Sequence, residues 1–234
     1  IDWNLYGRFE KMYLKLYLDE RQMQTRIYID GSTSMNFFGK GEYALRLATA
    51  FSYLSVKDMD KINIYLIQGD QAVPVLENII GKDSFMNSIG KLNSIRFDGV
   101  SNISKAIVSS MVGYGDGNSI IISDFLTDNN YTDAIDYLRS KKRDVLCLQV
   151  LGEEEIHPNF RGRLILHDSE DDGRFFKDNI NKDVIMAYKK ALKYVTEKAS
   201  NFCHSREAEY MLLSTKDDIK ELFLNKMIQR GIIQ

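Results

Sequence analysis

Short apolar runs alternate with longer amphipathic stretches along most of the 234-residue chain. Apolar runs bounded by turn residues predict strands, whereas apolar residues recurring every three to four positions predict helices. Strands are predicted for TRIYID (25–30), KINIYLIQ (61–68), NSIIISDF (118–125), RDVLCLQVL (143–151) and EYMLLST (209–215). Helices are predicted for residues 42–56, 101–112, 130–142, 183–202 and 217–231.

This alternation of strands and helices predicts the fold class α/β, with a mainly parallel central sheet covered by helices on both faces. We expect one domain over 1–234, because α/β domains of this length are commonly single units. Residues 1–24 form its N-terminal lead-in, in which KMYLKLYLDER alternates with a period of two and predicts an edge strand. A hairpin insertion is predicted at 161–180, turning at 171–173.

Composition excludes several classes of function. The 31 basic and 33 acidic residues give a formal net charge of −2, so no overall positive field would attract nucleic acid. The apolar runs are far shorter than the roughly 20 residues that cross a bilayer, so we expect no membrane contact by this fragment. Two cysteines make no disulfide framework and fit a reducing compartment. We therefore expect a cytoplasmic domain, although residues before Ile1 could tether it to a membrane.

Polar oxygen-bearing side chains gather where the predicted strands end. Asp30 ends one strand and is followed by Ser32, Thr33 and Ser34, while Asp124 ends another. A third loop, FDGVSNIS (97–104), presents Ser101 before a helix. Because ligands bind beyond the carboxyl ends of parallel strands, these loops could converge on a hard cation. The alternative is structural: Asp30 caps the following turn and the serine hydroxyls satisfy loop backbone groups.

The same residues resemble the metal-ion-dependent adhesion site of von Willebrand factor A domains. The resemblance rests on Asp30-Gly31-Ser32-Thr33-Ser34 after an apolar strand, a middle-loop hydroxyl, and Ser123-Asp124 ending a later strand. It implies a Rossmann-like von Willebrand factor A fold and a Mg²⁺ or Mn²⁺ site. The metal ligands would be Asp30, Ser32, Ser34, Ser101 and Asp124. That family most often has threonine where this chain has Ser101.

The flanking segments are similar to the bacterial "domain of unknown function 58" proteins, which usually occur with MoxR-type AAA+ ATPases. The similar segments are IDWNLYGRFEKMYLKLYLDER (1–21), LHDSEDDGRFF (166–176) and residues 187–231. The resemblance implies a non-catalytic, metal-dependent protein-binding domain that recruits an acidic residue of a partner protein. It also implies an adaptor working with a MoxR-type AAA+ ATPase in protein maturation or remodelling.

Three other functions are compatible with parts of the sequence. IDGSTS resembles the phosphate loop of actin-like sugar kinases, but the following residues predict a helix instead of the second strand of a hairpin. A Mg²⁺-dependent phosphoester hydrolase could use Asp30 and Asp124, but the motif loops offer no evident general base. DSEDDGRFFKDN (168–179) mimics a calcium loop but ends on Asn179 instead of glutamate.

Bulky apolar residues flank the proposed metal loops: Phe37, Phe38, Phe125 and Leu126. Their simplest role is core packing. Any of them that is exposed would instead form an apolar rim suited to docking a protein partner.

Overall fold

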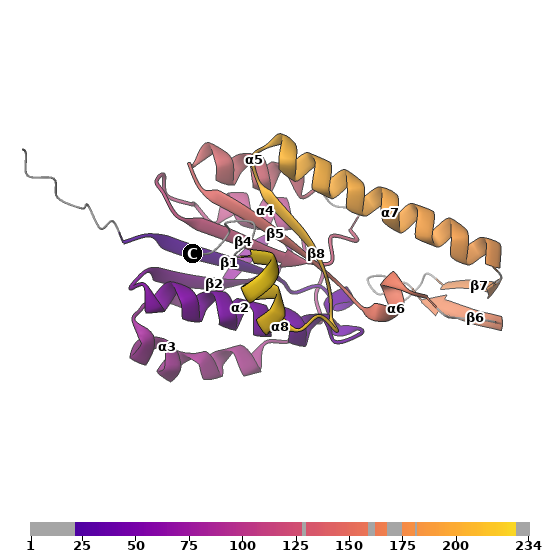
Figure 1. The fold of residues 1–234 in the computed structure, drawn as a ribbon, viewed down its shortest axis with the longest axis horizontal. Coiled ribbons are helices and arrows are strands. Elements are labelled where there is room, and N and C mark those ends of the chain that lie inside the picture. The colour runs from indigo at the N-terminus through magenta and orange to yellow at the C-terminus, as the bar shows by residue number, and fades with distance from the viewer. Residues whose placement is uncertain (1–21, 128–129, 159–161, 168–174, 181, 228–234) are drawn as a thin grey trace, which may run out of the picture.

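A six-stranded sheet organises the computed structural model, which describes residues 22–127, 130–158, 162–167, 175–180 and 182–227 (Figure 1). Its strand order is β3-β2-β1-β4-β5-β8, and every neighbouring pair is parallel except β2 and β3. The strands are β1 (Gln24–Asp30), β2 (Lys61–Gln68), β3 (Gln71–Ile80), β4 (Asn118–Ser123), β5 (Asp144–Leu151) and β8 (Glu209–Ser214). The predicted α/β class and mainly parallel sheet are confirmed.

Strand β3 is the one strand of this sheet that the apolar pattern did not predict. Its sequence, QAVPVLENII, contains Pro74, which lacks a backbone N–H and usually argues against a strand. The structure accommodates this proline because β3 is an edge strand that pairs on one side, antiparallel to β2. The register irregularities between Ile62 and Tyr65 lie in this same pair of strands.

Helices cover both faces of the sheet (Figure 1). Helices α2 (Lys40–Lys57) and α3 (Lys82–Ser88) pack on one face, and α4 (Ile103–Ser109), α5 (Thr132–Ser140) and α7 (Lys182–Ser205) on the other. Strand β1 serves both cores because successive side chains point to opposite faces. Ile27 and Ile29 lie in the α2 core, whereas Tyr28 lies in the α4 and α5 core and stacks on Tyr65 at 5.3 Å.

Short elements complete the chain. These are the 3-10 turns η1 (Thr33–Asn36) and η2 (Ile89–Ser94), helices α6 (Glu153–Ile156) and α8 (Ile219–Glu221), and the π-helical turn η3 (Leu222–Met227). The predicted C-terminal helix therefore begins at Ile219, where the Asp218 carboxylate accepts hydrogen bonds from the N–H groups of Lys220 and Glu221. Its predicted end at Gly231 lies outside the described residues.

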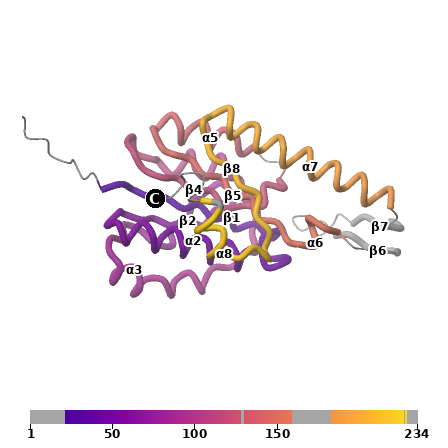
Figure 2. Tube along the Cα trace, viewed as in Figure 1, coloured from indigo at the N-terminus to yellow at the C-terminus, as the bar shows by residue number. Residues whose placement is uncertain are grey.

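Strands β6 (Gly162–His167) and β7 (Phe175–Ile180) pair antiparallel, which corresponds to the hairpin expected at 161–180. The turn at 171–173, the calcium-loop residues and the edge strand of the 1–24 lead-in lie outside the described residues. Helix α7 follows this hairpin and extends well beyond the sheet (Figure 2). Among the described helices, none combines the length and apolar character needed to cross a membrane.

Candidate metal centre

The first loop of the candidate centre leaves β1 at Asp30, which is buried. One carboxylate oxygen, Oδ1, accepts a 2.9 Å hydrogen bond from the backbone N–H of Ser32. The hydroxyls of Ser32 and Ser34 lie 3.0 Å apart. The Asp-x-Ser-x-Ser spacing thus brings one carboxylate and two hydroxyls together within five residues.

Gly31 sets the path by which β1 enters this loop. Its N–H donates to the carbonyl of Ile67 at 3.0 Å, so the loop starts close against the end of β2. A Cβ atom at position 31 would lie 2.5 Å from that carbonyl oxygen, which is closer than real Cβ contacts allow. A side chain here would therefore displace the turn that carries Ser32.

The middle loop lies against the first. The backbone N–H and the hydroxyl of Thr33 both donate to the carbonyl of Gly99, at 2.8 and 3.1 Å. Two residues further, Ser101 is buried and its backbone forms a parallel bridge with Gly69, just after β2. These contacts place Ser101 at the same end of the sheet as the first loop.

The third loop follows β4 and is joined to the first by Ser123. The Ser123 hydroxyl donates to Asp30 Oδ2 at 2.5 Å and accepts from the Phe125 N–H at 2.9 Å. The next residue, Asp124, is also buried, and its Oδ1 accepts from the Leu126 N–H at 3.0 Å. Its carbonyl accepts a 2.6 Å hydrogen bond from the Gln149 side chain on β5.

A buried lysine, which the sequence analysis did not select, binds Asp124. The Lys40 ammonium lies 2.8 Å from Asp124 Oδ2 and 2.8 Å from Glu155 Oε1, and the lysine side chain is 2% exposed. Burial alone would lower the pKa of Lys40, but the two carboxylates raise it above its ordinary value. Lys40 is the first residue of α2, two positions before the predicted start of this helix at 42. The macrodipole disfavours a cation there, so a lysine needs acidic partners.

The oxygen donors of the first loop fit a hard cation. In an octahedral Mg²⁺ site with ligands at about 2.0–2.1 Å, adjacent ligands lie about 3 Å apart, which matches the separation of the Ser32 and Ser34 hydroxyls. Asp30 uses both carboxylate oxygens in hydrogen bonds, but each oxygen retains a further lone pair. Asp124 differs, because Lys40 already neutralises the oxygen it would offer. In the described part of the chain, no cluster of three His, Cys, Asp or Glu side chains suited to a metal occurs.

Three of the four predicted rim residues are exposed. Phe37, Phe38 and Leu126 are 48%, 45% and 40% exposed and lie in the loops after β1 and β4. The fourth, Phe125, is 2% exposed and packs edge-on against Tyr131 with ring centroids 5.1 Å apart. Phe125 is therefore a core residue, and its inclusion in a partner-binding surface was wrong. Its backbone has a positive φ of 50°, and its side chain lies in the core that contains α4 and α5.

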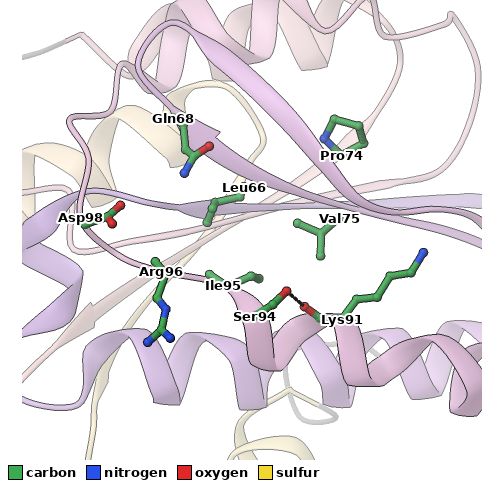
Figure 3. A pocket seen from close by; sticks show the side chains of 9 residues that line it. All are labelled: Leu66, Gln68, Pro74, Val75, Lys91, Ser94, Ile95, Arg96 and Asp98. Carbon is green, nitrogen blue, oxygen red and sulfur yellow. Dashed lines mark hydrogen bonds between the residues drawn. The ribbon is translucent and has the colours of Figure 1, made fainter.

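A cleft of about 470 Å³ lies beside the middle loop, between β2, β3 and η2 (Figure 3). Leu66, Val75 and Ile95 contribute apolar surface, and the Ser94 hydroxyl donates to the Lys91 carbonyl at 2.7 Å. The charged ends of Lys91 and Arg96 point away from each other in Figure 3. The described residues that line this cleft include none of the five candidate metal ligands, so the candidate centre is a separate feature.

The sheet order, the antiparallel edge strand β3 and the loops at the carboxyl ends of β1 and β4 define a von Willebrand factor A-like α/β domain. The chain belongs to the DUF58 family, described as "Protein of unknown function DUF58", whose family model matches residues 1–198. A search of curated proteins found no significant match.

Several solved structures are similar to this chain. The pilus adhesin SpaC from Lactobacillus rhamnosus GG, in an open conformation, is 10% identical with a TM-score of 0.52, and the match covers 91% of this chain and 30% of SpaC. An aerotolerance-related membrane protein from Bacteroides fragilis NCTC 9343, with multiple mutations to serines, is 17% identical over 89% of this chain and 99% of that chain, with a TM-score of 0.48. A von Willebrand factor type A protein from Catenulispora acidiphila is 12% identical over 56% and 33% of the two chains, with a TM-score of 0.42. At these identities the likeness to SpaC supports the fold alone.

Proposed function

We propose that this domain is a non-catalytic, divalent-metal-dependent protein-binding module. The observation that carries this proposal is the group formed by buried Asp30 and Ser32 and half-buried Ser34, whose two hydroxyls are hydrogen-bonded at 3.0 Å just after β1. A Mg²⁺ or Mn²⁺ ion held there by few charged ligands stays electrophilic and can accept a carboxylate from outside the protein. Ser101 and Asp124 would complete the site from the other two loops.

The partner would present an acidic residue to the ion and apolar side chains to the rim of Phe37, Phe38 and Leu126. By family resemblance, this partner or its remodeller is a MoxR-type AAA+ ATPase, and the assembly would act in maturation or remodelling of other proteins. This rim is adjacent to the candidate ligands in sequence, since Phe37 follows Ser34 by three residues and Leu126 follows Asp124 by two. The ion would orient the partner's acidic residue, and the apolar rim would add buried area to the interface.

The arrangement around Glu155 favours binding over hydrolysis. A metal-dependent hydrolase needs a general base near the ion. Glu155 is a candidate, because it binds the same Lys40 ammonium as Asp124. Its Oε1 binds Lys40, and its Oε2 accepts a 2.7 Å hydrogen bond from the Gly152 N–H. Both oxygens are thus engaged. The kinase alternative is also disfavoured, because β1 leads through η1 into α2 and pairs in parallel with β2 and β4.

The direct test is calorimetric titration of Mg²⁺ and Mn²⁺ into the purified chain and into Asp30→Ala and Asp124→Ala. Saturable binding that is lost in Asp30→Ala and weakened in Asp124→Ala is expected. Asp70→Ala is the matched control, because Asp70 is an exposed carboxylate after β2 that pairs with Lys105. Equal binding in all four proteins would refute the site. Phosphatase turnover that vanishes in Asp30→Ala would favour the hydrolase instead.

A further inference from the structure

We propose that Lys40 is a built-in competitor of the divalent cation at Asp124, and that Glu155 holds the Lys40 ammonium when the cation binds. This inference rests on the proposed metal-dependent function and adds a means of regulating the same site. It assigns roles to two residues that the motif of Asp30, Ser32 and Ser34 does not contain.

The geometry makes Lys40 a bridge between two carboxylates of different loops. Its ammonium lies at 2.8 Å from both Asp124 Oδ2 and Glu155 Oε1, so it can release one carboxylate and keep the other. The Lys40 side chain is enclosed, and that of Glu155 is more accessible than that of Asp124. Glu155 is held in place by the N–H of Gly152, which fixes the position that would receive the ammonium.

Charge explains why the two cations compete. Asp124 Oδ1 accepts the Leu126 N–H and Oδ2 accepts the Lys40 ammonium, so an ion bound to this carboxylate would lie close to the ammonium. An ammonium and a divalent ion bound to one buried carboxylate repel each other strongly at low dielectric. Without Lys40, the buried carboxylate of Asp124 and the partly buried carboxylate of Glu155 would lose the positive charge between them. The lysine therefore stabilises the metal-free loops and opposes loading.

The position of Lys40 adds a second argument. A lysine in the first turn of α2 meets the positive end of the helix dipole, which costs stability unless acidic groups compensate it. Its neighbour Gly41 packs so closely on Phe97 that a Cβ would lie 2.4 Å from the ring, so the start of the helix is pinned against the segment leading to the middle loop. The backbone of Lys40 is thus fixed near Asp124. The long side chain still allows the ammonium to shift between Asp124 and Glu155.

The experiment measures Mg²⁺ affinity by calorimetry and thermal stability in EDTA and in Mg²⁺ for three variants. Lys40→Met should bind Mg²⁺ at least about tenfold more tightly than the wild type. In EDTA its melting temperature should be lower than that of the wild type. Mg²⁺ should raise its melting temperature by more than that of the wild type, because the ion then supplies the missing positive charge. Glu155→Gln should bind Mg²⁺ more weakly, because the ammonium loses its second partner. Lys105→Met, which removes an exposed lysine on α4, should stay within about twofold of wild type.

The outcomes separate this inference from the proposed function. If the wild type binds Mg²⁺ and Lys40→Met binds it equally or more weakly, the competition is refuted and the metal site stands. If only Lys40→Met binds, the competition is supported and metal binding by the wild-type domain alone is refuted. If neither protein binds, both proposals fail. Should Lys40→Met not fold, Lys40→Gln, which retains a hydrogen-bond donor, takes its place with the same expected direction.

Discussion

The hydroxyl of Ser123, at the end of β4, donates a 2.5 Å hydrogen bond to Asp30 Oδ2, at the end of β1. This contact joins two loops that are 93 positions apart in the chain. Because Asp30 also accepts the Ser32 N–H, its carboxylate is oriented from both sides. Such orientation lowers the cost of assembling a metal site.

Ser123→Ala should therefore weaken both the fold and the site. The variant loses a buried hydrogen bond to a charged group, which is worth about 1.5–3 kcal/mol, and leaves the Phe125 N–H without that acceptor. We expect the free energy of unfolding in urea to fall by about 2 kcal/mol and the Mg²⁺ affinity to fall with it. Ser94→Ala, which removes an exposed hydroxyl, is the control and should change stability by less than about 0.5 kcal/mol. Equal effects of the two substitutions would contradict the assigned contact.

Gly31→Ala should damage the first loop through its backbone. The added Cβ would meet the Ile67 carbonyl oxygen at 2.5 Å, and a backbone atom in a sheet cannot move aside cheaply. Overpacking of this kind costs about 1–3 kcal/mol, and we expect a loss in that range together with weaker Mg²⁺ binding. Gly90→Ala is the matched control, because a Cβ there meets nothing within 4 Å. A Gly31→Ala protein as stable as Gly90→Ala would refute the argument.

Tyr43→Phe should stabilise the protein, increasingly so at alkaline pH. The Tyr43 hydroxyl is buried and has no hydrogen-bond partner among the described residues, so its removal should gain about 1 kcal/mol. Burial first, and then Asp217 and Asp218, raise the pKa of Tyr43 from about 10 to about 12. The folded state therefore retains this proton after the unfolded chain has lost it.

The sign of the pH effect follows from that difference in pKa. A group whose pKa is raised on folding contributes stability that is complete below about pH 10 and is lost as the pH rises toward about 12. Tyr43→Phe lacks this loss, so its advantage over the wild type should grow by up to about 2 kcal/mol over that interval. Urea denaturation at pH 8 and pH 11.5 measures it. A constant difference between the two proteins would contradict the assignment.

Sequence reasoning succeeded where the signal is local. The apolar runs of the parallel strands are visible within a few residues, and the structure has strands where they predict them. The Asp30, Ser32 and Ser34 spacing is equally local, and the metal site that it suggests stays a prediction. Sequence reasoning failed where the deciding contact is remote. Strand β3 was not predicted because the edge position that accommodates Pro74 depends on pairing with β2, and Lys40 was not selected because its partner Asp124 lies 84 positions away.

The same limit applies to the rim. Phe37, Phe125 and Leu126 look alike in sequence, since each is a bulky apolar residue close to a candidate ligand. The Phe125 ring packs in the core against Tyr131 from a backbone with a φ of 50°, whereas Phe38 has a φ of 55° and is exposed, so the sign of φ alone does not decide which residue is buried. A positive φ at a non-glycine residue depends on the surrounding loop contacts, here including the Ser123 hydroxyl on the Phe125 N–H, and a single sequence does not reveal it.

Phe37→Ser and Leu126→Ser test the exposed part of this rim as a docking surface. Both side chains are about half buried, so we expect stability to fall by about 1 kcal/mol and Mg²⁺ affinity to remain that of the wild type. Capture of a MoxR-type AAA+ ATPase from the same organism, measured by biolayer interferometry in Mg²⁺, should weaken at least about tenfold, because buried aromatic anchors dominate such interfaces. Met86→Ser is the control, because Met86 is 54% exposed on α3. Helix α3 follows the end of β3, which pairs with the amino end of β2 and therefore lies away from the candidate metal loops. If Met86→Ser weakens capture as much as Phe37→Ser, the surface has been misplaced. If all three variants capture the ATPase like the wild type while Asp30→Ala does not, the ion alone recruits the partner and the rim has no part in it.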